Sequence, residues 1–260
     1  MNPILLDKTR AVTRPVHSFL MLGQSNMAGR GALDEAPPIK NERLFMLRNG
    51  RWQPLSEPVN YDRPFAGVSL AVSFADEYAR AFDTAVGLIP CADGGSSLAD
   101  WRPGGPLYDH AVFQCGLAGR ISEVKGILWH QGEADSGSEE DAAAYEERFC
   151  ALIAALRKDC GLSRVPLVIG ELGAFLAALP EGCRCFREVN AALARIAART
   201  PRCALASAAG LVSKGDNLHF DSRSLRELGR RYFAAFDTIR IKPRSLCAGS
   251  GGSAAPEGCR

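Results

Sequence analysis

FLMLGQSNMAG, residues 19–29, is the stretch around which the rest of the chain is organised. The apolar run over 16–22 predicts a buried strand that stops at Gly23. Ser25 follows at once in a polar turn, and the carboxyl ends of strands are where an open α/β sheet collects ligands and chemistry. A serine hydroxyl there can act as a nucleophile if a base takes its proton. The alternative is an ordinary Ser/Asn turn between a strand and a helix.

Strands and helices alternate along the rest of the chain. The predicted strands cover 16–22, 44–47, 85–91, 126–130, 165–170 and 204–208, and the predicted helices cover 68–82, 110–123, 138–161, 186–196 and 223–238. A loop rich in proline and glycine separates the first strand from the first long helix. This alternation predicts an α/β fold with a parallel sheet and helices on both of its faces.

The length and composition favour one α/β domain. The 260 residues are 47% hydrophobic, and the net charge of +2 comes from charges of both signs scattered along the chain. Because no basic stripe is interleaved with aromatic residues, we expect no nucleic-acid partner. We assign the domain to 1–242 and expect a disordered tail over 243–260, which is rich in Gly, Ser, Ala and Pro. The oligomeric state is not predicted.

Targeting and membrane-spanning patterns are absent from the sequence. No apolar run approaches the roughly 18 residues of a membrane span. The N-terminal segment MNPILLDKTRAVTRP lacks the apolar core and the cleavage pattern of a secretory signal. If the chain begins at Met1, we expect a cytoplasmic protein without a membrane partner. Its nine cysteines, an odd number, fit reduced thiols better than a disulfide framework.

Patterns typical of metal or cofactor binding are also absent from the sequence. Cys183 and Cys185 are the only close cysteine pair, and they lack a second Cys/His pair at zinc spacing. H-E-x-x-H does not occur, and G-x-G-x-x-G does not follow the first strand. Ser25 does not lie in G-x-S-x-G either, because Met27 stands where the second glycine is needed. We therefore expect neither a metal nor a cofactor.

The segment 216–219 offers the base, and the group that orients it, which an acyl-transfer site needs. Asp216 and His219 lie three residues apart in a turn that opens a helix. The carboxylate can therefore hold one ring nitrogen while the other faces Ser25. The alternatives are a turn carboxylate and a surface histidine. His130, at the end of a predicted strand, is either a rival base or a hydrogen-bonded histidine that fixes its loop.

Three groups are candidates to stabilise a developing oxyanion. They are the backbone N–H of Ser25, the backbone N–H of Gly95 with Gly94 as the fallback, and the side-chain amide of Gln131. The loss of one such donor typically costs about 10²–10³ in rate. We interpret the two carboxylates in 133–135 as acceptors that hold their loop.

Four short blocks follow one another in order: LGQSNM at 22–27, GGSSL at 94–98 with Trp101 after it, WHQGEAD at 129–135, and DNLHF at 216–220. Together they resemble the blocks of the SGNH-type hydrolases, in the form used by the sialate O-acetylesterase-like group. That group is carbohydrate esterase family six, with plant and bacterial acetyl xylan esterases. The blocks span most of the chain, and W-H-Q-G-E and G-Q-S-N-M in one chain are specific.

The resemblance implies a three-layer α/β/α sandwich with a flavodoxin-like parallel sheet. It implies a triad of Ser25, His219 and Asp216, and an oxyanion hole built from Ser25, Gly95 and Gln131. It further implies a serine esterase that removes acetyl groups from acetylated carbohydrates of xylo-oligosaccharide or sialic acid type through an acetyl-enzyme. No metal or cofactor takes part. The partner expected is a small acetylated carbohydrate.

Further residues of the blocks are expected to bind the substrate or to support loops: Gln24, Asn26, Trp101, His130 and Glu133. Trp101 and Trp52 either stack on a sugar ring or pack a loop. Gln131 stands where many SGNH enzymes carry asparagine, which favours the narrower group. Two other functions remain open: a lipid or thioester hydrolase of the same fold, and an inactive sugar-binding protein.

Overall fold

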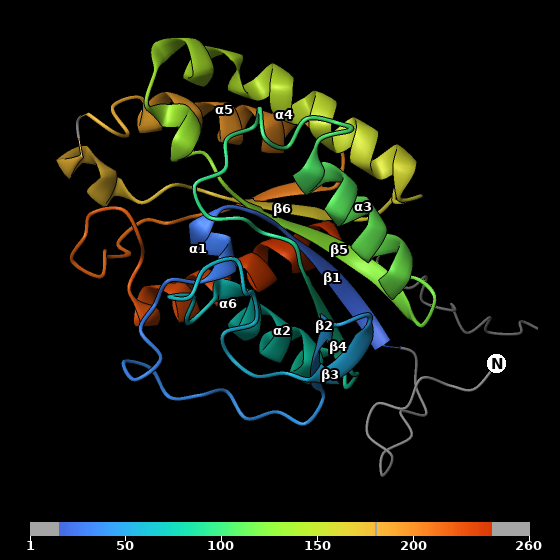
Figure 1. The fold of residues 1–260 in the computed structure, drawn as a ribbon. Coiled ribbons are helices and arrows are strands. Elements are labelled where there is room, and N and C mark those ends of the chain that lie inside the picture. The colour runs from blue at the N-terminus through green and yellow to red at the C-terminus, as the bar shows by residue number, and fades with distance from the viewer. Residues whose placement is uncertain (1–15, 180, 241–260) are drawn as a thin grey trace, which may run out of the picture.

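The computed structural model describes residues 16–179 and 181–240, and it has three layers with a seven-stranded sheet in the middle (Figure 1). The strands are β1 (Val16–Gly23), β2 (Leu44–Arg48), β3 (Arg51–Pro54), β4 (Val86–Pro90), β5 (Ser122–His130), β6 (Leu167–Gly170) and β7 (Cys203–Ala206). Their order is β3-β2-β4-β1-β5-β6-β7, and all neighbours are parallel except β2 and β3. The predicted parallel α/β sheet is confirmed, with β1 at its centre.

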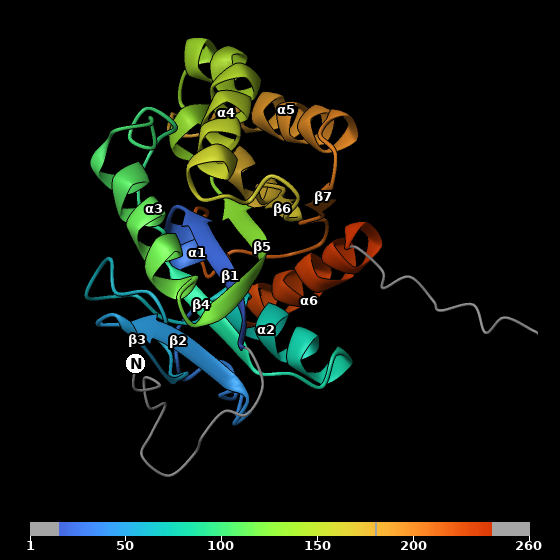
Figure 2. The same ribbon diagram turned by 90° about the vertical axis from the view of Figure 1, so that its right-hand side faces the viewer.

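Helices cover both faces of this sheet, as Figure 2 shows. One face carries α3 (Pro106–Ala118), α4 (Glu139–Asp159) and α5 (Phe186–Arg199), and the other carries α2 (Leu70–Ala81) and α6 (Ser222–Ile239). The helix α1 (Ser25–Ala28) is a single turn after β1, and two short 3₁₀ segments, η1 (Ala134–Ser136) and η2 (Ala174–Ala178), lie in loops. The three-layer sandwich expected from the sequence is confirmed.

The strand β1 is apolar from Phe19 to Leu22, where both of its faces are buried. Leu20 and Leu22 join the core beneath α3, α4 and α5, whereas Phe19 and Met21 join the core beneath α2 and α6. This alternation follows from the two-residue period of a strand. The Phe19 ring meets the Phe74 ring edge-on at 4.8 Å. The central strand is thereby fixed from both sides, and its carboxyl end has a defined position.

Three of the helices, α2, α4 and α6, begin at side-chain caps. Ser69 accepts a hydrogen bond from the Ala71 N–H, and the predicted cap Ser138 accepts one from the Asp141 N–H. Such caps typically contribute about 1 kcal/mol. Gly161, at φ 68°, follows the end of α4 as expected, because the left-handed region suits glycine.

Two sequence predictions in the middle of the chain were wrong in their boundaries. The helix predicted at 110–123 is α3 at 106–118, because Pro106 fits its first turn, where a missing N–H costs nothing. The strand predicted to begin at 126 begins at Ser122, which pairs with the start of β1. The sequence reasoning also missed β3. The two-residue loop Asn49-Gly50, with both residues at positive φ, was the available hairpin signal.

Among residues 16–179 and 181–240, no helix is long and apolar enough to cross a bilayer. The N-terminal segment MNPILLDKTRAVTRP and the tail predicted over 243–260 lie outside the described residues.

Candidate active site

Ser25 follows the carboxyl end of the central strand β1 by way of Gly23, which no other residue could replace. Gly23 has φ 122°, and a Cβ there would lie 2.1 Å from the backbone oxygen of His130. The Gln24 N–H donates to this same oxygen at 2.9 Å. The chain then turns at once into α1, so Ser25 is presented at the carboxyl end of the central strand. Ser25 is 5% exposed.

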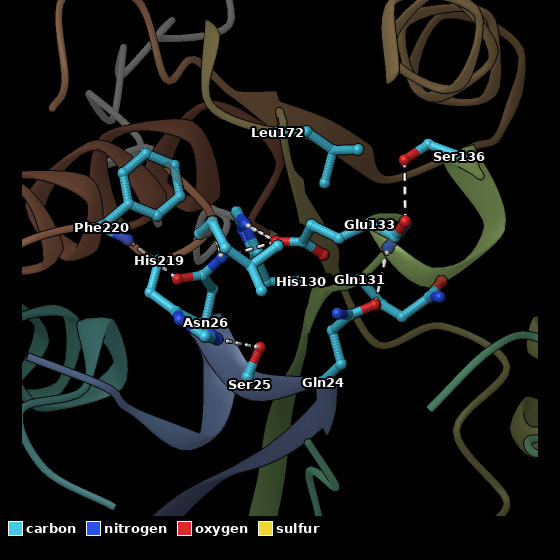
Figure 3. Close-up of polar contacts among 12 residues, drawn as sticks. Gln24, Ser25, Asn26, His130, Gln131, Glu133, Ser136, Leu172, His219 and Phe220 are labelled. Carbon is cyan, nitrogen blue, oxygen red and sulfur yellow. Dashed lines mark hydrogen bonds and ion pairs between the residues drawn. The ribbon is translucent and has the colours of Figure 1, made fainter. Parts of the chain in front are cut away.

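The structure brings Ser25, His219 and Asp216 together in one hydrogen-bonded row (Figure 3 shows Ser25 and His219). The Nε2 of His219 lies 3.0 Å from the Oγ of Ser25, and its Nδ1 lies 2.7 Å from the Oδ2 of Asp216. The other carboxylate oxygen, Oδ1, accepts from the backbone N–H of His219 at 2.8 Å. This is the geometry expected of a nucleophile, a base and a group that orients the base.

The surroundings favour a neutral imidazole beside a charged carboxylate. Burial lowers the pKa of His219 below its usual value, and this outweighs the opposite effect of Asp216. Burial alone would raise the pKa of Asp216, but hydrogen bonds from the His219 backbone, the His219 ring and the Leu218 backbone bring the pKa below its usual value. Since Nδ1–H donates to the carboxylate, Nε2 presents its lone pair to the Ser25 hydroxyl.

Short-range hydrogen bonds shape the loop that carries this histidine. The Ser213 hydroxyl oxygen accepts from the N–H of Gly215 at 3.1 Å and of Asn217 at 2.8 Å. The Lys214 N–H donates to the His219 backbone oxygen at 2.9 Å. The loop is therefore held in one shape although much of it is exposed.

Asn26 fastens this loop to α1. Its Nδ2 donates to the Leu218 oxygen at 3.3 Å, and its Oδ1 accepts from the Phe220 N–H at 3.1 Å, so it holds both neighbours of His219 (Figure 3). Its Nδ2 also donates to Glu133 Oε1 at 2.5 Å. Of the two roles considered for Asn26, loop support is the one that these contacts favour.

A buried layer lies beneath Asn26 and contains His130 and Glu133. The Tyr232 hydroxyl donates to the Trp129 oxygen at 2.7 Å, so it accepts from His130 Nδ1–H at 2.9 Å. His130 Nε2 then lies 3.9 Å from Glu133 Oε1. Burial lowers the pKa of His130 to about 3 and raises the pKa of Glu133 to about 7. The two are therefore neutral neighbours between about pH 3 and pH 7. Among the described residues, His130 makes no hydrogen bond to Ser25, and it fixes its loop.

The predicted oxyanion role of Gln131 does not fit the geometry. This residue is fully buried, and its Nε2 donates to the Ser96 oxygen at 3.1 Å and to Asp135 Oδ2 at 2.5 Å. The Tyr145 hydroxyl donates to the Gln131 backbone oxygen at 2.8 Å and lies 3.2 Å from the Gln131 Oε1. Both amide hydrogens are used by acceptors below the site, so none is left for a substrate oxygen. The expectation that Glu133 and Asp135 act as loop-holding acceptors agrees with these contacts.

The turn at Gly94 and Gly95 rests on a buried ion pair that the sequence reasoning missed. The Gly94 N–H donates to Asp62 Oδ2 at 2.8 Å, and Arg30 Nη2 lies 2.5 Å from the same oxygen. A Cβ on Gly94 would come within 2.3 Å of Arg30 Nη2, so a side chain there would have to displace this ion pair. This uses the fallback donor and leaves Gly95, at φ 83°, at the exposed tip. No motif around Arg30 or Asp62 could have revealed the pair.

Trp101 packs within its loop and Trp52 packs against the sheet, so neither offers a face for a sugar. Trp101 is 1% exposed, and its Nε1 donates to the Ser96 hydroxyl at 2.9 Å. Trp52 is equally buried and lies against Gly87, where a Cβ would come within 2.5 Å of its ring. The stacking interpretation was wrong for both residues as the structure has them.

Cys183 and Cys185 are both buried and unpaired. Within the part of the chain that the structure describes, no group of three or more His, Cys, Asp or Glu side chains could hold a metal ion.

Comparison with known proteins agrees with the fold and identifies a family. The family model described as carbohydrate esterase, sialic acid-specific acetylesterase, matches residues 15–238. The chain belongs to this family. A probable carbohydrate esterase of Arabidopsis thaliana is 29% identical over 240 residues, which cover 83% of this chain and 88% of the plant protein. The resemblance to the sialate O-acetylesterase-like group is confirmed.

Solved structures share the fold of this carbohydrate esterase family member. The X-ray structure of an Arabidopsis thaliana protein has a TM-score of 0.80 at 27% identity and covers 88% of this chain and all of that chain. A carbohydrate acetylesterase from Xanthomonas citri has a TM-score of 0.67 at 19% identity, covering 86% of this chain and 56% of that chain. A lipase/acylhydrolase from Enterococcus faecalis has a TM-score of 0.53 at 12% identity, covering 88% of this chain and 100% of that chain. The last two likenesses confirm the SGNH-type fold alone.

Family membership and the plant relative support an esterase that acts on carbohydrates. The acetyl xylan specificity named by the sequence resemblance stays a prediction, as do the chemical roles of the individual site residues.

Proposed function

We propose that this protein is a serine esterase that hydrolyses O-acetyl groups of a small acetylated carbohydrate through an acetyl-enzyme intermediate. The observation that carries the proposal is the unbroken row from Ser25 Oγ through the His219 ring to Asp216, in a member of a carbohydrate esterase family. A serine, a neutral histidine and a carboxylate in this order can perform acyl transfer without any further reactant except water.

The first half of the reaction acylates the serine. His219 Nε2 takes the proton of Ser25 while Oγ forms a bond to the acetyl carbonyl carbon, and the carbonyl electron pair moves onto its oxygen. The tetrahedral intermediate then breaks the bond to the sugar oxygen, which receives the proton from His219. Asp216 stabilises the imidazolium during both proton transfers. The products are the deacetylated sugar and acetylated Ser25.

The second half releases acetate. A water molecule gives a proton to His219 Nε2 and attacks the acetyl-enzyme carbonyl. The new tetrahedral intermediate expels Ser25 Oγ, which recovers its proton from His219. Acetate leaves, and the starting hydrogen-bonded row is restored.

Hydrolysis of p-nitrophenyl acetate tests the chemistry. The wild-type protein should turn this ester over, whereas Ser25→Ala should lose the activity down to the uncatalysed background, since removal of a triad serine can cost on the order of 10⁶ in kcat. Thermal unfolding of both proteins serves as the folding control. Equal rates for the two folded proteins would end the proposal.

Acetate release from a panel of substrates tests the sugar class. We expect release from acetylated xylo-oligosaccharides, acetylated sialic acids or simple acetyl sugars, and the panel identifies which. A chain-length series of p-nitrophenyl esters should favour acetyl. A preference for long acyl chains would instead indicate a lipid or thioester hydrolase of the same fold.

A further inference from the structure

Two glutamines, Gln24 and Gln131, follow the neighbouring carboxyl ends of β1 and β5. Hydrogen-bond donors hold the amide of Gln24, whereas acceptors hold the amide of Gln131. The Oε1 of Gln24 accepts from the backbone N–H groups of Gly132 at 3.4 Å and Ala134 at 3.3 Å. Because both partners are donors, the atom that faces them has to be the amide oxygen. The amide nitrogen of Gln24 therefore points away from the 132–134 segment. In Figure 3 it lies on the side of Ser25.

The nitrogen of this amide is left open. Among the described residues, Nε2 of Gln24 has no hydrogen-bond acceptor, although the residue is 3% exposed. Among the described residues, several side-chain polar atoms are fully buried and lack a hydrogen-bond partner, and Gln24 Nε2 is not one of them. An amide that is held through its oxygen and keeps an unused donor beside the nucleophile is already oriented before a substrate arrives.

We propose that Gln24 is a catalytic residue whose Nε2–H donates to the oxyanion at Ser25, the role first expected of Gln131. This inference rests on the proposed esterase function. A donor fixed in advance stabilises charge as it develops and costs no reorganisation during the reaction. Gln24 meets this condition through its two backbone anchors, whereas Gln131 has both amide hydrogens bound to Ser96 and Asp135.

The anchoring role and the donating role of Gln24 belong to different atoms, so one substitution can separate them. Gln24→Glu keeps an oxygen that accepts from Gly132 and Ala134, but it replaces the NH₂ donor by a second oxygen. Gln24→Ala removes both roles. The matched control is Gln131→Glu, which keeps the acceptor for Tyr145 and loses the donors to Ser96 and Asp135.

We expect Gln24→Glu to lower kcat for p-nitrophenyl acetate by about 10²–10³, with KM changed only a few-fold and with a Tm close to that of the wild type. The rates are compared at the plateau of each pH profile, because a new carboxylate beside His219 also moves the acid limb. Phenylboronic acid, which forms a tetrahedral adduct with a serine, should lose affinity by a comparable factor. Gln131→Glu should lower the Tm and keep kcat within about tenfold wherever it is folded.

A Gln24→Glu protein with kcat within about threefold of the wild type would overturn the inference. So would a folded Gln131→Glu protein whose kcat falls as far as that of Gln24→Glu. If Ser25→Ala is inactive while Gln24→Glu is fully active, only the role of Gln24 is wrong. If Ser25→Ala is as active as the wild type, the proposed function itself fails.

Discussion

The carboxyl ends of β1 and β5 lie next to each other, with Gly23 paired to His130, yet they differ in what their polar groups do. After β5, the groups of Gln131 and Asp135 are buried and bound to protein partners. After β1, Ser25 and the Gln24 nitrogen face the site, and Asn26 holds the histidine loop. One strand end supplies the reacting groups, and its neighbour supplies the support.

The two glutamines show why the ends differ. Backbone N–H donors surround the Gln24 oxygen, so its nitrogen stays free for other use. A carbonyl and a carboxylate surround the Gln131 nitrogen, so its donors are used up inside the protein. The same side chain can thus serve either purpose, and the neighbouring polarity decides which.

Apart from the loss of Ser25 itself, the largest effect should come from the residue that orients its base. Asp216→Asn should lower kcat for p-nitrophenyl acetate by about 10⁴, because an amide can hold His219 in the wrong tautomer and does not stabilise the imidazolium. Steady-state kinetics measure this, with circular dichroism as the folding control. A loss below tenfold would mean that Asp216 is a turn residue only.

A smaller effect, at or below that expected of Gln24→Glu, should follow the loss of Asn26, which links the two regions. Asn26→Ala leaves the Leu218 oxygen and the Phe220 N–H without their partner, so the loop that carries His219 should shift. A displacement of about 1 Å can cost about 10² in rate. We expect kcat to fall by about that factor while KM changes little.

Asn41→Ala is the matched control for Asn26→Ala. It removes a similar side-chain bond, from Asn41 Nδ2 to Asp76 at 2.8 Å, outside the four blocks. Its kcat should equal that of the wild type. Equal kcat values for the two variants would show that Asn26 does not position the histidine loop.

A substitution of Glu133, on the supporting side after β5, should change how the free energy of unfolding depends on pH. The folded-state pKa of Glu133 is raised to about 7 by burial, so the folded protein keeps a proton that the unfolded chain loses above about pH 4.5. Its contribution therefore makes the free energy of unfolding fall as pH rises from about 4.5 to 7. Glu133→Gln keeps an acceptor for Asn26 and should remove this slope.

Urea unfolding of both proteins at several pH values between 4.5 and 7 measures the Glu133 effect. The difference between the two proteins isolates Glu133 from His130, whose lowered pKa makes stability fall as pH drops below 6.5. Parallel stability curves for wild type and Glu133→Gln would contradict the prediction.

The smallest expected effect is a shift in the pH at which activity falls on the acid side. Burial lowers the pKa of His219 below its ordinary 6.5, so the neutral base persists to lower pH. The acid limb of kcat/KM, which reports the free enzyme, should have its midpoint below pH 6.5. A midpoint above 6.5 would show that Asp216 outweighs burial.

Sequence reasoning predicted the alternation of strands and helices, the parallel sheet, the family and the residues 25, 216 and 219 that the structure brings together. These depend on local periodicity and on short blocks, which one chain displays directly. The boundary errors around α3 and β5 arose because apolar spacing was followed and Pro106 was overlooked as a start signal.

The amino-acid sequence by itself determined the strand that leads to Ser25, its end at Gly23 and the order of the four blocks. Only the tertiary structure decided which amide atoms are free and which tryptophans are buried. The partners of the Gln131 amide nitrogen include the Ser96 oxygen, 35 positions away, and those of the Gln24 oxygen lie 108 and 110 positions away. Hydrogen-bond competition among groups so far apart in the chain exists only once the strands are side by side.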